Sequence, residues 1–197
     1  GPDDYRWFSD DRVAMLHTRL SIIDLEGGAQ PLVSHDKRWV GIVNGELYDY
    51  EEIRERLRER GVTCKTKSDS EVLLNLFALD GAAGLASVSG EFAFIFYDRL
   101  DRKIHFGRDP FGVKPLFFEN RPERFTLASE MKALSDETPV FDPAYVNAFL
   151  AKTVVPPRTC LEGIEHAWPG RLYSLDLNTR RLESVAYHRL PLSQERP

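Results

Sequence analysis

The chain has 197 residues, and its 31 acidic and 26 basic side chains give a formal charge of −5. This length suits one domain, or one domain with a short appendage, and a hydrophobic content of 42% excludes a disordered or fibrous chain. The acidic balance argues against a general nucleic-acid binder, and the longest apolar run, residues 92–97, is too short to span a membrane. Two cysteines, Cys64 and Cys160, are too few for a disulfide-stapled secreted fold, so the sequence predicts a cytoplasmic α/β-type protein.

The first third of the chain is strand-rich. Alternating side chains predict a strand over residues 13–18 that continues to Asp24. Residues 31–34 and 38–43 flank a polar tripeptide and predict a hairpin, whose second strand Asn44-Gly45 closes.

Two helices follow. Asp49 and Glu52 match a capping box for the first helix, and Gly61 is the expected stop. A short strand is predicted over residues 62–66. The Ser68-Asp69-Ser70 segment then caps a second helix, which carries an apolar stripe.

The remainder again favours strands. Residues 92–97 are apolar on both faces, as expected of a central strand. Asp142-Pro143 starts a short helix that runs to Leu150. Further strands are predicted over residues 103–107, 116–119, 124–129, 171–176 and 181–187, with a helical turn over 130–135. We therefore expect a core over residues 1–135 and an extension of the same domain over 136–197.

Taken singly, the polar residues have ordinary structural explanations. Arg19 reads as a solvated charge, Asn44-Gly45 as a hairpin turn and Asp69 as a helix cap. The hairpin turn is disfavoured because only three residues separate Gly45 from the expected helix, which leaves little room for a return strand. His17 and His105 lie within strand patterns and are expected to pack or hydrogen-bond rather than catalyse.

Taken together, the same residues suit a pocket for a free amino acid. A guanidinium binds an α-carboxylate, which suggests Arg19, and carboxylates bind an α-ammonium group, which suggests Glu46 and Asp69. The Asn44 amide and the Gly45 backbone N–H could stabilise an oxyanion. Only a nucleophile is missing.

A series of ordered motifs spans nearly the whole chain. They are Gly1-Pro2-Asp3-Asp4, residues 19–25, Gly28-Ala29-Gln30-Pro31, residues 44–48, Ser68-Asp69-Ser70-Glu71, residues 90–94, 107–116 and 129–134, and the region from Val155 to Gly170. With these motifs the chain resembles the glutamine amidotransferase domain of asparagine synthetases, which are class II glutaminases of the N-terminal-nucleophile hydrolase type.

The resemblance implies a fold and a set of roles. The fold would be α+β, a four-layer αββα sandwich, here missing its first strand and helix. Arg19 would hold the α-carboxylate of glutamine, and the backbone of Leu20, Ser21, Ile22 and Ile23 would line the site. Asn44 and Gly45 would form the oxyanion hole, while Glu46 and Asp69 would bind the α-amino group.

The chain also departs from the family pattern. Family members begin with a catalytic cysteine whose own α-amine acts as the base. That segment is absent here, and neither Cys64 nor Cys160 can be an N-terminal nucleophile. Lys67 stands where the family commonly has a glycine.

These features leave two functions open. In the first, the intact protein hydrolyses glutamine and passes ammonia to an ATP-pyrophosphatase-type synthetase domain, with the cysteine lost by truncation, cleavage or disorder. In the second, the domain is a non-catalytic pseudo-glutaminase that braces an amide- or lactam-forming synthetase. The complete pocket favours the first function, so we expect the intact protein to be a glutamine-hydrolysing enzyme.

The same reasoning predicts the partners and cofactors. L-glutamine is the expected ligand, with no nucleic acid, membrane or metal. No Ser-Gly-Gly-x-Asp-Ser loop occurs, so ATP and magnesium are expected only in the synthetase domain. Loss of a sheet strand would leave an unpaired edge, which favours association, for example into a homodimer.

Overall fold

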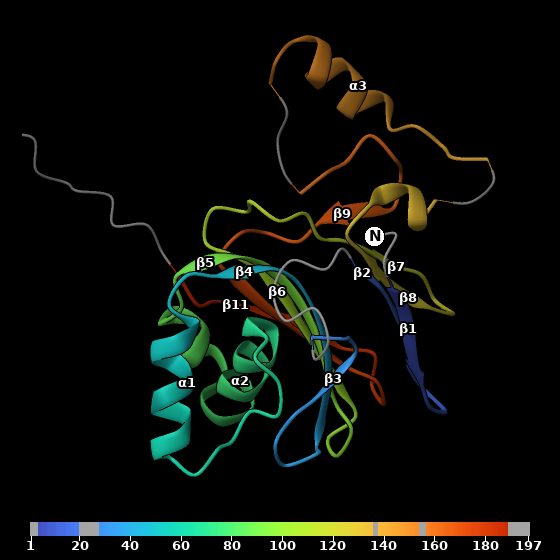
Figure 1. The fold of residues 1–197 in the computed structure, drawn as a ribbon. Helices are drawn as coiled ribbons and strands as arrows, with labels where there is room; N and C mark the ends of the chain where they lie inside the picture. The colour runs from blue at the N-terminus through green and yellow to red at the C-terminus, as the bar shows by residue number, and fades with distance from the viewer. Residues whose placement is uncertain (1–3, 20–27, 136–137, 154–156, 189–197) are drawn as a thin grey trace, which may run out of the picture.

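A six-stranded antiparallel sheet forms the centre of the molecule, with the strand order β11-β10-β6-β5-β4-β3 (Figure 1). The structure is a computed structural model that describes residues 4–19, 28–135, 138–153 and 157–188. The strands of this sheet are β3 (Leu32–Val33), β4 (Trp39–Leu47), β5 (Gly90–Asp98), β6 (Lys103–Arg108), β10 (Arg171–Asp176) and β11 (Leu182–Ala186).

Two helices, α1 (Tyr50–Glu59) and α2 (Asp69–Ala86), cover one face of this sheet (Figure 1). Phe92, Phe94 and Phe96 of β5 point at them, and each is at most 1% exposed. Burying a side chain of this size contributes roughly 1.5–3 kcal/mol. The alternation of large rings on one side of β5 therefore fixes which face the helices cover.

A second β layer covers the opposite face. It contains the hairpin of β1 (Asp4–Ser9) and β2 (Ala14–Arg19) and a three-stranded sheet of β7 (Phe117–Asn120), β8 (Phe125–Ala128) and β9 (Ile164–His166). Phe118 and Met15 from this layer share a core cluster with Ile95 and Tyr97 of β5 and Phe106 of β6. The two core clusters thus lie on opposite faces of one sheet.

The described residues therefore supply three of the four expected layers: helices, central sheet and second β layer. The remaining elements are the single 3₁₀ turn η1 (Met131–Ala133) and α3 (Pro143–Leu150). Helix α3 projects away from both β layers (Figure 1). The expected first strand and helix of the sandwich have no counterpart among the described residues.

Several sequence-based expectations are confirmed. Strand β5 lies between β4 and β6, so it is a central strand. Helix α3 has Asp142 as its N-cap, whose carboxylate accepts the Ala144 and Tyr145 N–H groups, and Pro143 in its first turn. Gly61 follows the end of α1 with a φ of +82°, a conformation that glycine adopts without strain.

Two local predictions are wrong. Residues 62–66 form no strand. The Val62 N–H donates to the Leu57 carbonyl at 2.9 Å, and the Glu71 carboxylate accepts the Lys65 and Thr66 N–H groups at 2.7 and 2.6 Å, so these groups bond elsewhere than to a neighbouring strand. Asp49 occupies the N-cap position of α1 but makes no side-chain cap hydrogen bond. Its carboxylate instead accepts the Ser89 N–H at 3.2 Å, which ties the start of α1 to the start of β5.

Sequence patterns missed β1 and β9. Most side chains of β1 are exposed, so it lacks the apolar alternation that marks a strand. The predicted continuation of residues 13–18 is described only to Arg19. Residues 171–176 and 182–186 of the expected extension form β10 and β11, two strands of the central sheet.

Candidate functional site

The candidate residues Asn44, Gly45 and Glu46 lie within β4, near its C-terminal end. Strand β5 continues opposite them, pairing Asn44 with Ala93, Gly45 with Phe92 and Glu46 with Glu91. Asn44-Gly45 therefore forms no hairpin turn, and the prediction that it closes the strand is wrong. The strand ends at Leu47, and a two-residue turn leads into α1.

Gly45 permits an unusually close approach of β4 and β5. A Cβ atom at this position would lie 2.1 Å from the Glu91 carbonyl oxygen and 2.6 Å from the Phe92 Cα. The φ of Gly45 is +149°, which side-chain-bearing residues rarely adopt. Two independent constraints thus require glycine at this point of the strand.

Among the described residues, side chains rather than a further strand bond the outer edge of β4 beyond its pairing with β3. The Gln30 amide accepts the Val43 N–H at 2.7 Å and donates to the Val43 carbonyl at 3.0 Å. The Asp69 carboxylate accepts the Leu47 N–H at 2.9 Å. Because hydrogen-bonding groups alternate along a strand, the N–H of Gly45, midway between Val43 and Leu47, is directed to the same edge.

Asp69 joins this edge to the N-terminus of α2. The side chain of Ser68 caps the helix by accepting the Ser70 N–H at 3.2 Å, so Asp69 is the first helical residue rather than the cap. Its Oδ1 accepts the same N–H at 2.8 Å. Asp69 is only 4% exposed, and a negative charge at a helix N-terminus is favourable.

Asn44 and Glu46 point to the opposite side of the sheet from Val43 and Leu47. Their side chains are exposed, and Ile42 on the same face contacts the core cluster that the second β layer shares. The structure therefore brings together an amide, a backbone N–H and a carboxylate within three consecutive residues, with the buried Asp69 at the adjacent strand end. Hydrogen-bond donors and acceptors of this kind match the two ends of a polar amino acid.

Arg19 is described only in its backbone. It is the last residue of β2 and pairs with Asp4 in the second β layer. The predicted lining residues Leu20, Ser21, Ile22 and Ile23 lie outside the described residues. Their roles stay predictions.

Lys67 lies two residues before Asp69, in the segment that leads into α2. Its side chain is exposed. The Arg54 guanidinium donates to the Thr66 and Ser68 carbonyls on either side of it, the latter at 3.1 Å. Helix α1 thereby holds the backbone that carries Lys67 next to the candidate site.

Gln30 is the structural residue that sequence reasoning missed. It appeared within the Gly28-Ala29-Gln30-Pro31 motif but received no role. The structure buries it at 7% exposure and uses both ends of its amide on Val43, with a further contact from Nε2 to the Ser70 hydroxyl at 3.4 Å. A polar residue in a motif next to a predicted strand was the only available signal.

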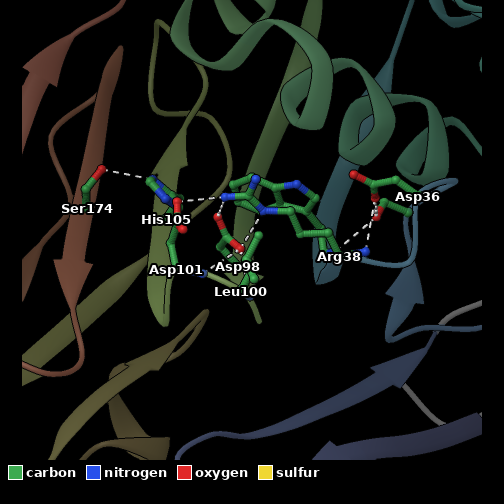
Figure 2. A network of polar contacts seen from close by, with 9 residues as sticks. Asp36, Arg38, Asp98, Leu100, Asp101, His105 and Ser174 are labelled. Carbon is green, nitrogen blue, oxygen red and sulfur yellow. Dashed lines mark hydrogen bonds and ion pairs between the residues drawn. The ribbon is translucent and has the colours of Figure 1, made fainter.

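A second polar cluster lies at the other end of the central sheet (Figure 2). The Arg38 guanidinium donates to Asp98 at 2.7 Å and to Asp101 at 2.7 Å, and the Ser174 hydroxyl lies 2.9 Å from His105 Nδ1. The His105 ring also contacts the rings of Trp39 and Phe77, as expected of a histidine that packs. Burial lowers the pKa of His105 to about 4, so the ring is neutral at pH 7.

Cys64 does not have the surroundings of a nucleophile. Burial raises the pKa of the Cys64 thiol, which disfavours the reactive thiolate. Within the described ranges, no group of three or more histidine, cysteine or acidic side chains is arranged to hold a metal ion. No described helix is long and apolar enough to cross a membrane.

Comparisons with known proteins identify the family to which the chain is similar. A family model described as a glutamine amidotransferase domain matches residues 1–187. Asparagine synthetase [glutamine-hydrolyzing] 1 of Bacillus subtilis is 34% identical over 178 residues, which are 89% of this chain and 28% of that protein. Asparagine synthetase B of Escherichia coli is 38% identical over 135 residues, 68% of this chain and 24% of that protein.

Solved structures show the same fold. Glutamine phosphoribosylpyrophosphate amidotransferase from B. subtilis superposes with a TM-score of 0.62 at 20% identity, covering 89% of this chain and 35% of that one. A regulatory enzyme of purine biosynthesis gives a TM-score of 0.63 at 19% identity, with the same coverage. The chain spans only about a quarter of the length of its curated relatives.

Proposed function

Because this chain belongs to the glutamine amidotransferase domain family, whose fold is of the N-terminal-nucleophile hydrolase type, we propose that it binds L-glutamine at the end of β4. The observation that carries the proposal is the contiguous run of Asn44, Gly45 and Glu46, tied to the buried Asp69 through Leu47. A free amino acid needs charge at one end and neutral donors at its side-chain carbonyl. This arrangement supplies the carboxylates and the donors.

The donors suit amide hydrolysis. Attack on the side-chain carbonyl of glutamine places negative charge on its oxygen, and two neutral N–H donors can stabilise that charge. The Asn44 amide and the Gly45 N–H would serve this purpose, while Glu46 and Asp69 would hold the α-ammonium group and Arg19 the α-carboxylate. The nucleophile would be the N-terminal cysteine that family members carry.

The ammonia would then be consumed elsewhere in a longer protein. The names of the relatives describe glutamine-hydrolysing asparagine synthetases, and this chain covers less than a third of their length. We therefore propose that a synthetase domain, with its ATP and magnesium, is the partner that uses the released nitrogen. A homodimer and a cytoplasmic location are further expectations, which light scattering and cell fractionation would test.

The test measures binding and turnover separately. Calorimetric titration of the full-length protein with L-glutamine should show saturable binding, and an Asn44→Ala variant should lose glutamate release with a smaller loss of binding, because the donor acts on the developing oxyanion. Binding without turnover in the intact protein would favour the pseudo-glutaminase. Absence of binding would overturn the proposed site.

A further inference from the structure

We propose that Glu91 and Lys114 form a positioning pair that keeps Glu46 available for the α-ammonium group of the bound amino acid. The proposal rests on the function proposed above and adds two residues to that site. Neither residue is among those to which the sequence assigned a role.

The first observation is a pair of like charges. Glu46 of β4 and Glu91 of β5 are directly opposite in the antiparallel ladder, so their side chains leave the same face of the sheet. Opposed side chains of this kind have Cβ atoms about 4.5–5.5 Å apart, and like charges there repel. A cation beside these carboxylates would offset the repulsion.

Lys114 is that cation. Its Nζ lies 2.8 Å from Glu91 Oε1, and both side chains are 29% exposed. With Lys114 paired to Glu91, the charge of Glu91 is neutralised, and the Glu46 carboxylate remains open to a ligand. An ammonium group arriving from solvent therefore meets a single local negative charge on the face that carries Asn44.

The backbone holds Lys114 in this position. The carboxylate of Asp109, which is fully buried, accepts the Lys114 N–H at 3.0 Å and also the Phe111 and Val113 N–H groups at 3.0 Å. The Arg108 guanidinium donates to the Gly112 carbonyl in the same turn. Asp109 in turn donates its own N–H to the Phe92 carbonyl at 2.7 Å, next to Glu91. The turn thus presents Lys114 to β5 from a fixed backbone.

The chemistry of lysine gives the pair a specific consequence. Its ammonium is a point charge on a flexible four-carbon stem, chemically equivalent to the ligand's own α-ammonium. If Glu91 lost its charge, the next carboxylate for Lys114 would be Glu46. Lys114 would then compete with the ligand for the group that should bind it.

Calorimetric titration of the full protein with L-glutamine tests this. Glu91→Gln should weaken binding at least fivefold, because Lys114 turns to Glu46. The double variant Glu91→Gln/Lys114→Met, which keeps the net charge of the pair, should bind within twofold of the wild-type protein. Lys114→Met alone should bind at least as tightly as wild type.

Two controls separate this role from a structural one. 5-Amino-5-oxopentanoic acid is glutamine without its α-amino group, so its affinity should be the same in all four proteins. Glu183→Gln removes a more exposed ion pair, in which Arg181 Nη2 lies 2.7 Å from Glu183 Oε1, and should leave glutamine binding unchanged.

The outcomes are distinct. The proposal is overturned if wild type binds glutamine while Glu91→Gln binds equally well, or if adding Lys114→Met fails to restore binding. If the wild-type protein does not bind glutamine at all, the proposed function itself is wrong. Thermal unfolding of each variant identifies any loss of affinity that comes from loss of fold.

Discussion

The Asp69 carboxylate accepts the backbone N–H of Leu47 at 2.9 Å, which joins the first residue of α2 to the last residue of β4. Glu46 immediately precedes Leu47, so this hydrogen bond places Asp69 next to the strand position that carries Glu46. The bond lies at the outer edge of β4, beyond its pairing with β3, where the Gly45 N–H is also directed. The structural and the proposed ligand-binding roles of Asp69 can therefore be separated only by choosing the right substitutions.

Substitution of Asp69 should separate charge from hydrogen bonding. Asp69→Ala leaves the buried Leu47 N–H without an acceptor, which costs about 1–3 kcal/mol of unfolding free energy. Asp69→Asn keeps an oxygen for that N–H and should destabilise less. Both variants remove the negative charge, so both should bind L-glutamine at least tenfold more weakly, measured by calorimetry beside chemical denaturation.

The comparison of the two variants decides the role of Asp69. If Asp69→Asn is stable and binds glutamine as wild type does, the charge of Asp69 has no part in binding. A purely structural residue would show losses of affinity that follow losses of stability. We predict that Asp69→Asn loses affinity for glutamine without a matching loss of stability.

Gly45→Ala should disrupt the end of β4. The new Cβ would meet the Glu91 carbonyl oxygen at 2.1 Å, and the positive φ adds backbone strain, so we expect a loss of more than ~2 kcal/mol. Gly61→Ala is the matched control: its φ is +82°, but no atom lies within 4 Å of the added Cβ. Strain alone should cost about 1 kcal/mol there. Equal losses in the two variants, measured by urea denaturation, would contradict the proposed close approach.

Most helices and strands of the central sheet were readable from the sequence because their signals are local, whereas the layered fold was implied by the family resemblance. The caps Ser68 and Asp142 and the doubly apolar run of β5 each depend on neighbouring residues or on burial alone. The strand predicted over residues 62–66 is absent because Glu71 and Arg54 bond the backbone groups of Lys65 and Thr66, and only the folded chain brings these side chains there. A sequence pattern cannot show such a replacement of a strand.

The candidate site, like the fold, was predictable from the sequence only in part. The residue types at Asn44, Glu46 and Asp69 indicated the chemistry, because charge and hydrogen-bonding capacity belong to the side chains themselves. The extension of β4 through Gly45 was misjudged, because it depends on β5 lying alongside, a contact between residues about 45 positions apart in sequence. The role of Gln30 was invisible for the same reason.

Gln30→Met should open the outer edge of β4. The two side chains have similar volume, but methionine can neither accept the Val43 N–H nor donate to its carbonyl. Both buried backbone groups would lose their partner, and we expect a loss of about 2–6 kcal/mol, since each unsatisfied group costs about 1–3 kcal/mol. Hydrogen exchange should show faster exchange of the Val43 amide than in wild type.

A control distinguishes edge pairing from general core packing. Val72→Ala removes apolar volume beneath the same sheet, where Val72 is fully buried, without touching the edge hydrogen bonds. It should lower global stability while keeping the Val43 amide among the best-protected amides. If Gln30→Met leaves the exchange of Val43 unchanged, the amide does not secure this edge in solution.

His105 should make the protein less stable in mild acid. Burial lowers the pKa of His105 from 6.5 to about 4, so between these values the unfolded chain binds a proton that the folded protein excludes. Stability therefore falls as the pH drops from about 6.5 to about 4, by at most roughly 3 kcal/mol from this group. Burial works to raise the pKa of Asp98, but hydrogen bonds from Arg38 and the backbone lower it overall, so the stability that depends on Asp98 is lost only at still lower pH.

The variant that tests this is His105→Gln, whose amide can still bond to the Ser174 hydroxyl across the contact that His105 makes at 2.9 Å (Figure 2). The substitution removes packing against Trp39 and Phe77, so its stability at pH 7 should be lower than that of wild type. The difference between the two proteins should then shrink on acidification, because only wild type has a buried imidazole to protonate. Urea denaturation at pH 7, 6, 5 and 4 measures both curves. Parallel curves across this range would show that His105 does not resist protonation in the folded protein.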